Sequence, residues 1–306
     1  MMVSVCMITF NHEAFISQAI ESVMMQKTDF DFEMIIGEDS STDNTVSIIE
    51  KYAQKHPDRI RARCNSQNIG MVDNFIQTLN ECGGKYIAFL EGDDYWTDPW
   101  KLQKQVDFLE SYSNYAMLHT NKAVLRNNKL HKDYSLQIKS GYIFEDLMFV
   151  PLICTLTVLC KADILKNSLA RVNLLIEGRK WLMGDFPLWL DIAQNYQIAY
   201  LNELTGVYRF LDESSSHSKN IVKAYHFEHS VINVKEYYYK IYTKSNKKVS
   251  YRFKLRFKEM MFHAKKRLVL DYGWIAKKEL KSLILTNPFL FIYFLFNKSL
   301  RLLKFN

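Results

Sequence analysis

Three carboxylates follow a short apolar run near residue 90. Residues 86–90 read YIAFL, and Glu91, Asp93 and Asp94 come directly after them. An apolar run of this length, bounded by glycines, is typical of a fully buried parallel strand. In open α/β sheets, ligands bind beyond the carboxyl ends of such strands. Carboxylates gathered there repel one another unless a cation lies between them, so the segment predicts a site for Mg²⁺ or Mn²⁺ carrying phosphates.

A purely structural interpretation accounts for only part of this segment. Asp98 stands directly before Pro99, where an N-cap residue and the first turn of a helix are expected. That role explains Asp98 but leaves the three preceding carboxylates without a function, and we therefore favour the metal site.

The first 112 residues alternate between strand and helix patterns. Strands are expected over residues 3–9, 32–39, 59–64 and 86–90, with amphipathic helices between them and a further helix over 99–112. This alternation predicts an α/β fold with a parallel, Rossmann-like sheet flanked by helices. Residues 115–211 have a mixed pattern, with apolar strands at YAMLHT, CTLTVLC and QIAYLNEL.

The carboxyl ends of parallel strands share one edge of the sheet. Polar and aromatic side chains from three strand ends should therefore meet, and together they suit a nucleoside diphosphate. Phe10 would stack on the base, Asp39 would accept from a base N–H, Asp93 would bind ribose hydroxyls, and Asp94 would hold the metal on the pyrophosphate. Taken singly, Asp39 could be a turn former and Phe10 a core residue.

Three segments in this order resemble the inverting family 2 glycosyltransferases of the GT-A fold. They read ITFNHEAFISQAIESVMMQ, EDSSTDNTVSIIEKY and NIGMVDNFIQTLNECGGKYIAFLEGDDYW, and the resemblance covers residues 3–104 and more loosely extends to 209. The resemblance implies that Thr9, Asn11 and Asp39 contact the base and that Asn74 lies along the nucleoside. It also implies that Asp93 touches ribose or metal and that Asp94 is the metal ligand.

Four residues depart from the commonest form of that family pattern. Glu38 and Ser40 stand where Asp and Gly are frequent, and Phe10 stands where Tyr is frequent. Glu91 replaces the first Asp of the acidic cluster, so its place among the metal ligands is the least secured by the resemblance.

Inverting transfer requires a base that removes the proton of the acceptor hydroxyl. Because the leaving group is a diphosphate, a metal can neutralise its charge and one carboxylate base is sufficient. Asp185 lies in WLMGDFPLWLD, after Gly184 and at the start of an expected helix. In the resembled family, an acidic residue at this helix start is the general base, although Asp is also a common N-cap. Asp191 is expected on the exposed side of the same helix.

Arg209 follows Tyr208 and resembles a family Tyr-Arg pair that precedes a segment closing over the sugar nucleotide. It could bind phosphate with two hydrogen bonds or form a salt bridge within the fold. Members of the family often have a histidine soon afterwards, and His217 is the candidate here. His12, His56, His119 and His131 show no ligand spacing and are expected at the surface or in helix packing.

Composition divides the 306 residues into two regions. Residues 1–215 are expected to form the catalytic domain and 216–306 a basic, aromatic helical extension. From residue 247 onward there are 15 Lys and Arg against three acidic residues, whereas the preceding part has 25 basic and 30 acidic residues. The apolar run 282–297 is either a core helix or a helix lying among lipid headgroups, and its basic flanks favour contact with an anionic membrane.

Five scattered cysteines without a CxxC pair argue against disulfides and zinc, and favour a reducing compartment. The absence of a signal-peptide pattern at the amino terminus leads to an expected cytoplasmic location at the inner face of the membrane.

The sequence thus predicts a metal-dependent inverting glycosyltransferase that moves a sugar from a nucleotide sugar to a glycan or lipid-linked acceptor, and the resemblance favours UDP as the nucleotide. One alternative is a nucleotidyltransferase that makes sugar nucleotides, although residues 9–15 lack the glycine-rich loop expected there. The other is a non-catalytic interaction protein with an anion-binding tail. The acidic main region argues against a nucleic-acid partner.

Overall fold

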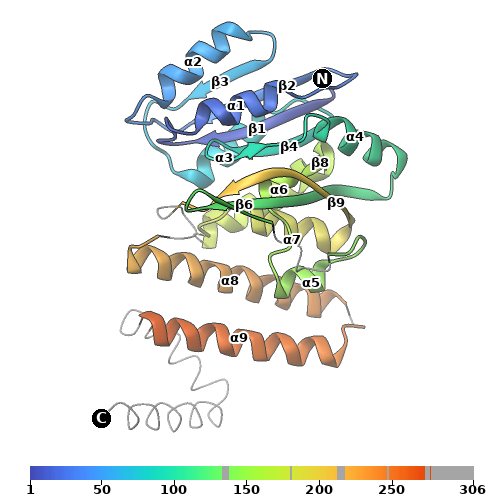
Figure 1. The fold of residues 1–306 in the computed structure, drawn as a ribbon. Coiled ribbons are helices and arrows are strands. Elements are labelled where there is room, and N and C mark those ends of the chain that lie inside the picture. Colours follow the sequence, from blue (N-terminus) through green and yellow to red (C-terminus); the bar gives the residue numbers. More distant parts are fainter. Residues whose placement is uncertain (133–137, 180, 212–217, 247, 273–275, 277–306) are drawn as a thin grey trace. The chain divides into compact units, whose positions relative to one another are not determined.

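The structure is a computed structural model that describes residues 1–132, 138–179, 181–211, 218–246, 248–272 and 276. The chain divides into two compact units, Met1–Leu211 and Asp212–Asn306. Figure 1 shows the elements of both.

The amino-terminal half of the first unit has the predicted alternation of strands and helices. Its elements are β1 (Val3–Thr9), α1 (Ile16–Met24), β2 (Phe32–Glu38), α2 (Thr45–Lys55), β3 (Ile60–Cys64), α3 (Met71–Glu81), β4 (Tyr86–Glu91), β5 (Tyr95–Trp96) and α4 (Lys101–Ser111). Strands β3, β2, β1 and β4 are adjacent and parallel.

Strands β1, β2 and β4 are covered on both faces, which explains their continuous apolar sequences, whereas β3 lies at the edge of the sheet and is only partly buried. On one face, Val5 and Met7 of β1 belong to a core that includes Ile20 of α1 and Val106 of α4. On the other face, Phe89 of β4 stacks on Phe75 of α3 with ring centroids 5.8 Å apart. The same Phe89 ring meets Trp189 edge to face at 5.5 Å.

The second half of the unit makes the sheet mixed. It contains β6 (Tyr115–Arg126), β7 (Lys129–Lys132), α5 (Phe144–Phe149), the 3₁₀ turn η1 (Thr155–Thr157), β8 (Leu159–Lys161), α6 (Ala162–Arg179), α7 (Asp185–Asn195) and β9 (Gln197–Arg209). The sheet order is β3-β2-β1-β4-β8-β6-β9-β5, with β7 paired to β6. Strand β8 is antiparallel to β4 and β6, whereas β9 is parallel to β6.

The prediction of one strand over CTLTVLC was wrong in its first half. Residues Thr155–Thr157 form the turn η1, and only Leu159–Lys161 pair in the sheet. The carbonyls of Leu156 and Thr157 accept hydrogen bonds from Trp96 Nε1 and Gln105 Nε2, each at 2.8 Å. These side-chain donors satisfy buried backbone carbonyls that would pair with a neighbouring strand if the segment were extended.

Two predictions about polar residues in this half were also wrong. Asp191 is only 8% exposed and pairs with Arg171, with Oδ2 2.5 Å from Nη2, because α7 is covered by α6. His119 is fully buried on β6, with its ring centroid 5.1 Å from that of Tyr200. Burial, followed by the charge of Lys122, lowers the pKa of His119 to about 3.

The second unit contains two long helices, α8 (Ile221–Ser245) and α9 (Tyr251–Tyr272). Their aromatic side chains form the contact between them, and Tyr239 stacks on Phe257 with centroids 4.1 Å apart. Asn220 caps α8, because its side chain accepts from the backbone N–H groups of Val222 and Lys223. The apolar run 282–297 and His217 lie outside the described residues. None of the helices in the described part has the length and apolar content needed to cross a bilayer.

Candidate active site

The strand ends that carry the predicted site residues do meet at one edge of the sheet. Thr9 is in register with Glu38, and Ile8 with Glu91. The pairing continues past the strands, since Asp39 N donates to Thr9 O at 3.1 Å and Gly92 N donates to Ile8 O at 2.9 Å. The predicted convergence of three strand ends is therefore confirmed.

Thr9 is buried between the other two strand ends. Its Oγ1 is 3.1 Å from His12 Nδ1. A Cβ at Gly92 would lie 2.5 Å from Thr9 Oγ1 and 2.9 Å from His12 Nδ1, so only glycine fits there without displacing both side chains.

His12 thus belongs to this edge, and the prediction of a surface or helix-packing position for it was wrong. Burial lowers its pKa, and the charges of Asp93 and Asp43 act in the opposite direction. The signal that could have located His12 is its place three residues after Thr9, within the turn that leaves β1.

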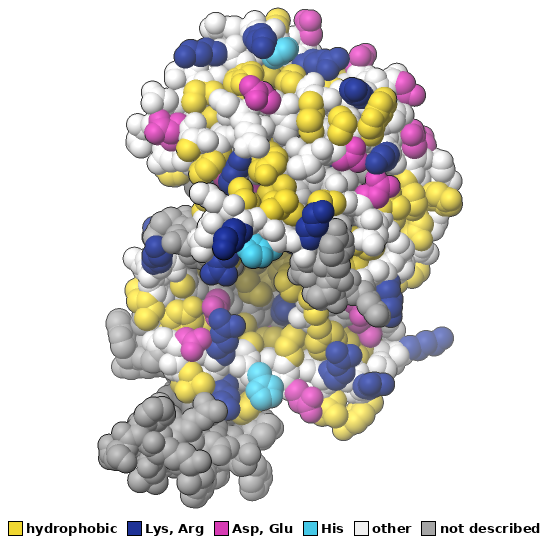
Figure 2. All heavy atoms as spheres, viewed as in Figure 1, with side chains coloured by type: hydrophobic (Ala, Val, Ile, Leu, Met, Phe, Trp, Pro, Cys, Tyr) yellow, Lys and Arg dark blue, Asp and Glu magenta, His cyan; other side chains and the backbone are white. Residues whose placement is uncertain are grey.

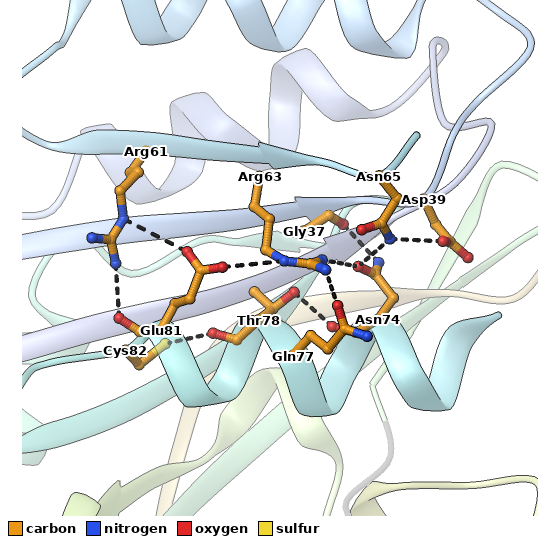
Figure 3. Close-up of polar contacts among 10 residues, drawn as sticks. All are labelled: Gly37, Asp39, Arg61, Arg63, Asn65, Asn74, Gln77, Thr78, Glu81 and Cys82. Atoms are coloured by element: carbon orange, nitrogen blue, oxygen red, sulfur yellow. Dashed lines mark hydrogen bonds and ion pairs between the residues drawn. The ribbon is translucent and has the colours of Figure 1, made fainter. Parts of the chain in front are cut away.

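Asp39 is almost completely buried and holds the loop that follows β3. Its Oδ1 accepts from Asn65 Nδ2 and Ile69 N, and its Oδ2 accepts from Gly70 N, all at 2.9 Å. Figure 3 shows the Asn65 contact and the polar residues behind it. Three of the carboxylate's lone-pair positions are occupied in this way, which leaves one for a ligand N–H.

Asn74 lies behind Asp39 rather than at the surface. It is 1% exposed, donates to Gly37 O at 2.8 Å, and accepts from Asn65 Nδ2 at 3.3 Å. Arg63 Nη1 approaches the same Asn74 oxygen at 3.4 Å (Figure 3). The structure therefore gives Asn74 a supporting position under Asp39, and its predicted contact with a nucleoside stays a prediction.

Asn11 and Phe10 lie on the outer side of this edge. Asn11 is exposed, and its Oδ1 accepts from Thr42 N at 2.8 Å, which ties the loop after β1 to the loop after β2. The Phe10 side chain is 41% exposed, a large value for an aromatic ring beside buried strand ends. A ring presented in this way is available to stack on a base.

Glu38 and Ser40 have structural roles in the turn that leaves β2. The buried Glu38 carboxylate accepts from Ser40 N at 3.0 Å and Ser41 N at 2.8 Å. Ser40 has φ of +60°, a left-handed conformation that glycine adopts with no steric penalty.

The three carboxylates after β4 lie in different environments. Asp94 is buried, and its Oδ1 accepts from Arg209 N at 2.7 Å. Burial, then the charges of Asp93 and Glu91, raises the pKa of Asp94 well above its usual range. Burial, then the charges of Asp93 and Asp185, raises the pKa of Glu91 to about 8. The carboxyl groups at this strand end thus disfavour one another's charged forms, with the Arg209 guanidinium acting in the opposite direction on Asp94.

The donor chemistry at this strand end fits a hard divalent cation, because every candidate ligand is a carboxylate oxygen. Within the described residues, however, no group of three or more His, Cys, Asp or Glu side chains is arranged to hold a metal ion. The structure therefore does not assemble Glu91, Asp93 and Asp94 into a ready three-ligand cage. A cation bound here would take one or two of them and complete its shell with substrate phosphate and water.

Arg209 connects β9 to the strand end, and no salt bridge of its side chain is found with the residues that the structure describes. Its guanidinium donates to Asp93 O and to Gln18 Oε1. The same group lies over the rings of Tyr95, at 4.6 Å, and Phe15, at 4.9 Å. These contacts leave Arg209 only 8% exposed. Arg209 therefore holds the loop over residues 93–95 in place, and its contact with phosphate stays a prediction.

Asp185 begins α7, as predicted, and points toward the η1 turn. Its Oδ1 accepts from Phe186 N at 2.7 Å, and its Oδ2 accepts from Thr155 Oγ1 at 2.8 Å. Its charge contributes to the raised pKa of Glu91, which places the two carboxyl groups in the same electrostatic neighbourhood. Gly184 permits the start of α7 to lie close to α3, since a Cβ at this position would lie 2.8 Å from the Phe75 ring.

Comparison with known families agrees with this arrangement. The sequence model described as glycosyl transferase family 2 matches residues 4–163, more than half of the chain, and includes all three converging strand ends. The chain belongs to glycosyl transferase family 2. The GT-A fold expected from the sequence is also confirmed, because solved glycosyltransferases share it.

Two curated relatives show how far the similarity of this glycosyltransferase extends. An uncharacterized protein of Mycobacterium tuberculosis is 43% identical over 109 residues, which are 36% of this chain and 32% of that protein. The chain thus matches only about a third of that relative's length. The Escherichia coli UDP-Glc:alpha-D-GlcNAc-diphosphoundecaprenol beta-1,3-glucosyltransferase WfgD is 26% identical over 220 residues, which are 71% of this chain and 81% of WfgD.

The crystal structure of Staphylococcus aureus TarS in complex with UDP-GlcNAc aligns with a TM-score of 0.59. The alignment covers 90% of this chain and 83% of the TarS chain at 16% sequence identity. At that identity the likeness concerns the fold of this glycosyltransferase, and substrates do not follow from it.

Proposed function

We propose that this family 2 glycosyltransferase transfers a sugar from a nucleotide sugar, namely a UDP-sugar, to a hydroxyl group with inversion at the anomeric carbon. The observation that carries the proposal is the meeting of polar strand-end residues and two sets of carboxylates at one edge of the sheet. Thr9, Asn11 and Asp39 supply the edge, Asp93 and Asp94 lie at its end, and Asp185 stands near Glu91.

The proposed roles follow from this order. Phe10 stacks on the base, Asp39 accepts a base N–H, and Asp93 binds ribose hydroxyls. A Mn²⁺ or Mg²⁺ ion held by Asp94, with Asp93 or Glu91, would stabilise the negative charge on the departing diphosphate. Arg209 keeps the Asp93–Tyr95 loop in place through its hydrogen bonds to Asp93 O and Gln18.

Asp185 is the proposed general base. It removes the proton of the acceptor hydroxyl while the acceptor oxygen forms a bond to the anomeric carbon. The bond between that carbon and the phosphate oxygen breaks at the same time, and the nucleoside diphosphate leaves with the electron pair. Asp185 retains unshared electron pairs for this task, because among the described residues each of its oxygens accepts one hydrogen bond.

We assign the acceptor to glycans or lipid-linked sugars of cell-surface polysaccharide assembly. WfgD, whose name specifies a UDP-sugar donor and an acceptor on a lipid diphosphate, is similar over most of both chains and supports this assignment. Peripheral attachment to the cytoplasmic face of the membrane through the basic carboxyl-terminal region completes the proposal.

The test is release of nucleoside diphosphate from a panel of nucleotide sugars, with Mn²⁺, Mg²⁺ or EDTA. We expect UDP as product, no pyrophosphate, and loss of turnover in EDTA. Asp185→Asn should lower kcat by roughly 10²- to 10⁴-fold with the donor still bound. Asp94→Ala should abolish metal-dependent binding of UDP in calorimetry.

Asp191→Asn is a matched control in the same helix. Its loss of the Arg171 ion pair should lower stability, whereas turnover per folded molecule should stay within threefold of the parent. Parent-like turnover by Asp185→Asn would remove Asp185 from the chemistry. Release of pyrophosphate instead of UDP would favour a nucleotidyltransferase.

A further inference from the structure

The Asp185 carboxylate is held from two different elements. One hydrogen bond comes from the N–H of Phe186 in its own helix, at 2.7 Å. The other comes from the Thr155 hydroxyl in the η1 turn, at 2.8 Å. A carboxylate tied only to its own helix could rotate about its side-chain bonds, whereas a second donor from another element fixes the direction of both oxygens.

The η1 turn is itself fixed rigidly by side chains. Leu156 O accepts from Trp96 Nε1 at 2.8 Å, and Thr157 O accepts from Gln105 Nε2 at 2.8 Å. The Leu156 side chain is fully buried, and a Cβ at Gly206 would lie 2.6 Å from its Cδ1. The turn therefore cannot shift without displacing β5, α4 or β9.

Trp96, which holds the η1 turn, lies close in the chain to the carboxylates that follow β4. Trp96 follows Asp94 by two residues, and its backbone N–H is held by Ser22 Oγ at 3.0 Å. The loop that presents Asp94 thus also holds the turn that presents Thr155. Asp94 and Asp185 are thus connected by a short path that runs along the backbone to Trp96, through its hydrogen bond to Leu156 O, and through the hydrogen bond of Thr155 to Asp185.

We infer that Thr155 is a positioning residue for Asp185, and that η1 sets the placement of this carboxylate relative to the Asp93–Asp94 strand end. This inference rests on the proposed function of Asp185 as general base. Thr155 itself touches no substrate in this scheme: its hydroxyl orients the carboxylate, so that an unshared electron pair faces the acceptor hydroxyl.

Replacement of Thr155 by Val tests the inference, because it removes the hydroxyl and keeps the side-chain shape. We expect kcat to fall by roughly tenfold to a hundredfold, as for loss of a hydrogen bond to a charged group. The KM for the nucleotide sugar and the Kd for UDP, measured by calorimetry, should stay within threefold. Thr155→Ser keeps the hydroxyl and should restore kcat to within threefold of the parent.

Thr157→Val is the matched control. Thr157 lies in the same turn and is fully buried, and its Oγ1 donates to Cys154 O at 2.6 Å, away from Asp185. Its kcat per folded molecule, with the folded fraction taken from thermal unfolding, should remain within threefold. If Thr155→Val does not fold, Thr155→Ala removes the same hydroxyl and takes its place.

Two results would overturn the inference. One is a parent-like kcat in the variant that lacks the hydroxyl. The other is an equal fall of kcat in the Thr155 and Thr157 variants, which would show that the turn acts only through stability. The Asp185→Asn variant distinguishes failure of the proposed function from failure of this inference. If Asp185→Asn keeps full turnover, the assignment of Asp185 as general base is wrong. If Asp185→Asn is inactive and Thr155→Val has the kcat of the parent, only the positioning role of Thr155 is wrong.

Discussion

Two non-glycine residues at the strand exits adopt left-handed backbone conformations, Asn11 with φ of +55° and Ser40 with φ of +60°. Such conformations are unfavourable for residues with a Cβ, less so for Asn, and they concentrate at functional sites. Here both lie where the backbone must turn sharply to place Phe10 and Asp39 at the same edge. The strain is local, and the hydrogen bonds that Ser40 N and Ser41 N donate to the Glu38 carboxylate offset it.

Substitution of Ser40 by Gly should therefore keep or raise the free energy of unfolding, by up to about 1 kcal/mol, because glycine has no penalty at this φ. Ser40→Val should lower it by roughly 1–2 kcal/mol. Urea unfolding measures both. Ser47→Gly is the control, at an exposed position inside α2, and its free energy of unfolding should fall by roughly 0.5–1 kcal/mol. Equal losses in the two glycine variants would contradict the strain at Ser40.

Lys101 is a second residue whose environment predicts a measurable effect. Its side chain is fully buried, its Nζ donates to Gln105 Oε1 at 2.7 Å, and it lies 4.3 Å from the centroid of the Trp96 ring. Burial lowers the pKa of Lys101 to about 7, against the opposing charge of Asp98. A charged lysine at this position therefore destabilises the folded state.

The sign of the pH dependence follows from proton counts. Between pH 7 and about 10.5 the unfolded chain holds the Lys101 proton and the folded chain does not, so this residue makes stability rise with pH. Between pH 7 and 10, the free energy of unfolding should therefore rise by up to roughly 3–5 kcal/mol more in the parent than in Lys101→Met. Lys104→Met is the control, because the carboxylates of Asp98 and Glu203 raise the pKa of Lys104 out of this window. Parallel pH curves for the parent and Lys101→Met would show that the buried amine does not titrate as described.

At the scale of elements, the packing of α3 against β2 decides whether Asp39 is held. The two elements approach so closely at Gly37 that a Cβ there would lie 1.8 Å from Thr78 Oγ1 and 2.8 Å from Asn74 Oδ1. Asn74 in turn reaches Gly37 O and Asn65, and Asn65 reaches Asp39 (Figure 3). The glycine is thus required by the close approach of helix and strand.

Gly37→Ala should lower the free energy of unfolding by roughly 1–3 kcal/mol, because α3 must move away from the sheet. Adding Thr78→Ala removes the nearest obstructing atom and should recover part of the loss, a coupling that a double-mutant cycle in urea measures. Gly178→Ala in α6 is the control: nothing lies within 4 Å of its added Cβ, and stability should rise by roughly 0.5–1 kcal/mol. If the effects of Gly37→Ala and Thr78→Ala on the free energy of unfolding were additive, the close contact between these two positions would be contradicted.

At the scale of the whole molecule, charge is distributed unevenly along the chain. The acidic excess lies before residue 247 and the basic excess after it. On the face seen in Figure 2, Lys and Arg side chains stand among hydrophobic and acidic ones instead of forming one continuous basic area. Binding to an anionic membrane would therefore combine electrostatic attraction with contact of apolar side chains.

Cosedimentation of the full chain with vesicles tests this proposal. Vesicles containing phosphatidylglycerol should bind the protein more tightly than pure phosphatidylcholine vesicles, and added salt should weaken the binding. Exchange of the exposed Lys244, Arg252 and Lys258 for Gln should weaken it roughly tenfold or more, at about 1 kcal/mol per basic residue near the surface. The same exchange of the exposed Lys51, Lys55 and Lys129 removes equal charge from the first unit and should have little effect. Equal weakening by both triple variants would show that net charge alone governs binding.

The amino acid sequence by itself determined the amino-terminal half of the fold and most of the strand-end residues. Continuous apolar runs mark strands buried on both faces, and parallel strands bring their carboxyl ends to one edge, so Thr9, Asp39 and Asp94 could be grouped from their places along the chain. Asp185 at the start of a helix was recognisable in the same way, since helix starts have local signals.

Only the tertiary structure decided what these side chains contact. Residues Thr155–Thr157 of the CTLTVLC segment form a 3₁₀ turn because Trp96 and Gln105 donate to its carbonyls, and Asp191 is buried because α6 covers it and supplies Arg171 as its partner. His12 joined the site through the close approach of Gly92, and Thr155 through its hydrogen bond to Asp185. Each of these contacts joins residues that are far apart in the sequence or lie in different elements. The local pattern of apolar and polar residues predicts helices and strands, but it does not predict which side chains of different elements come into contact.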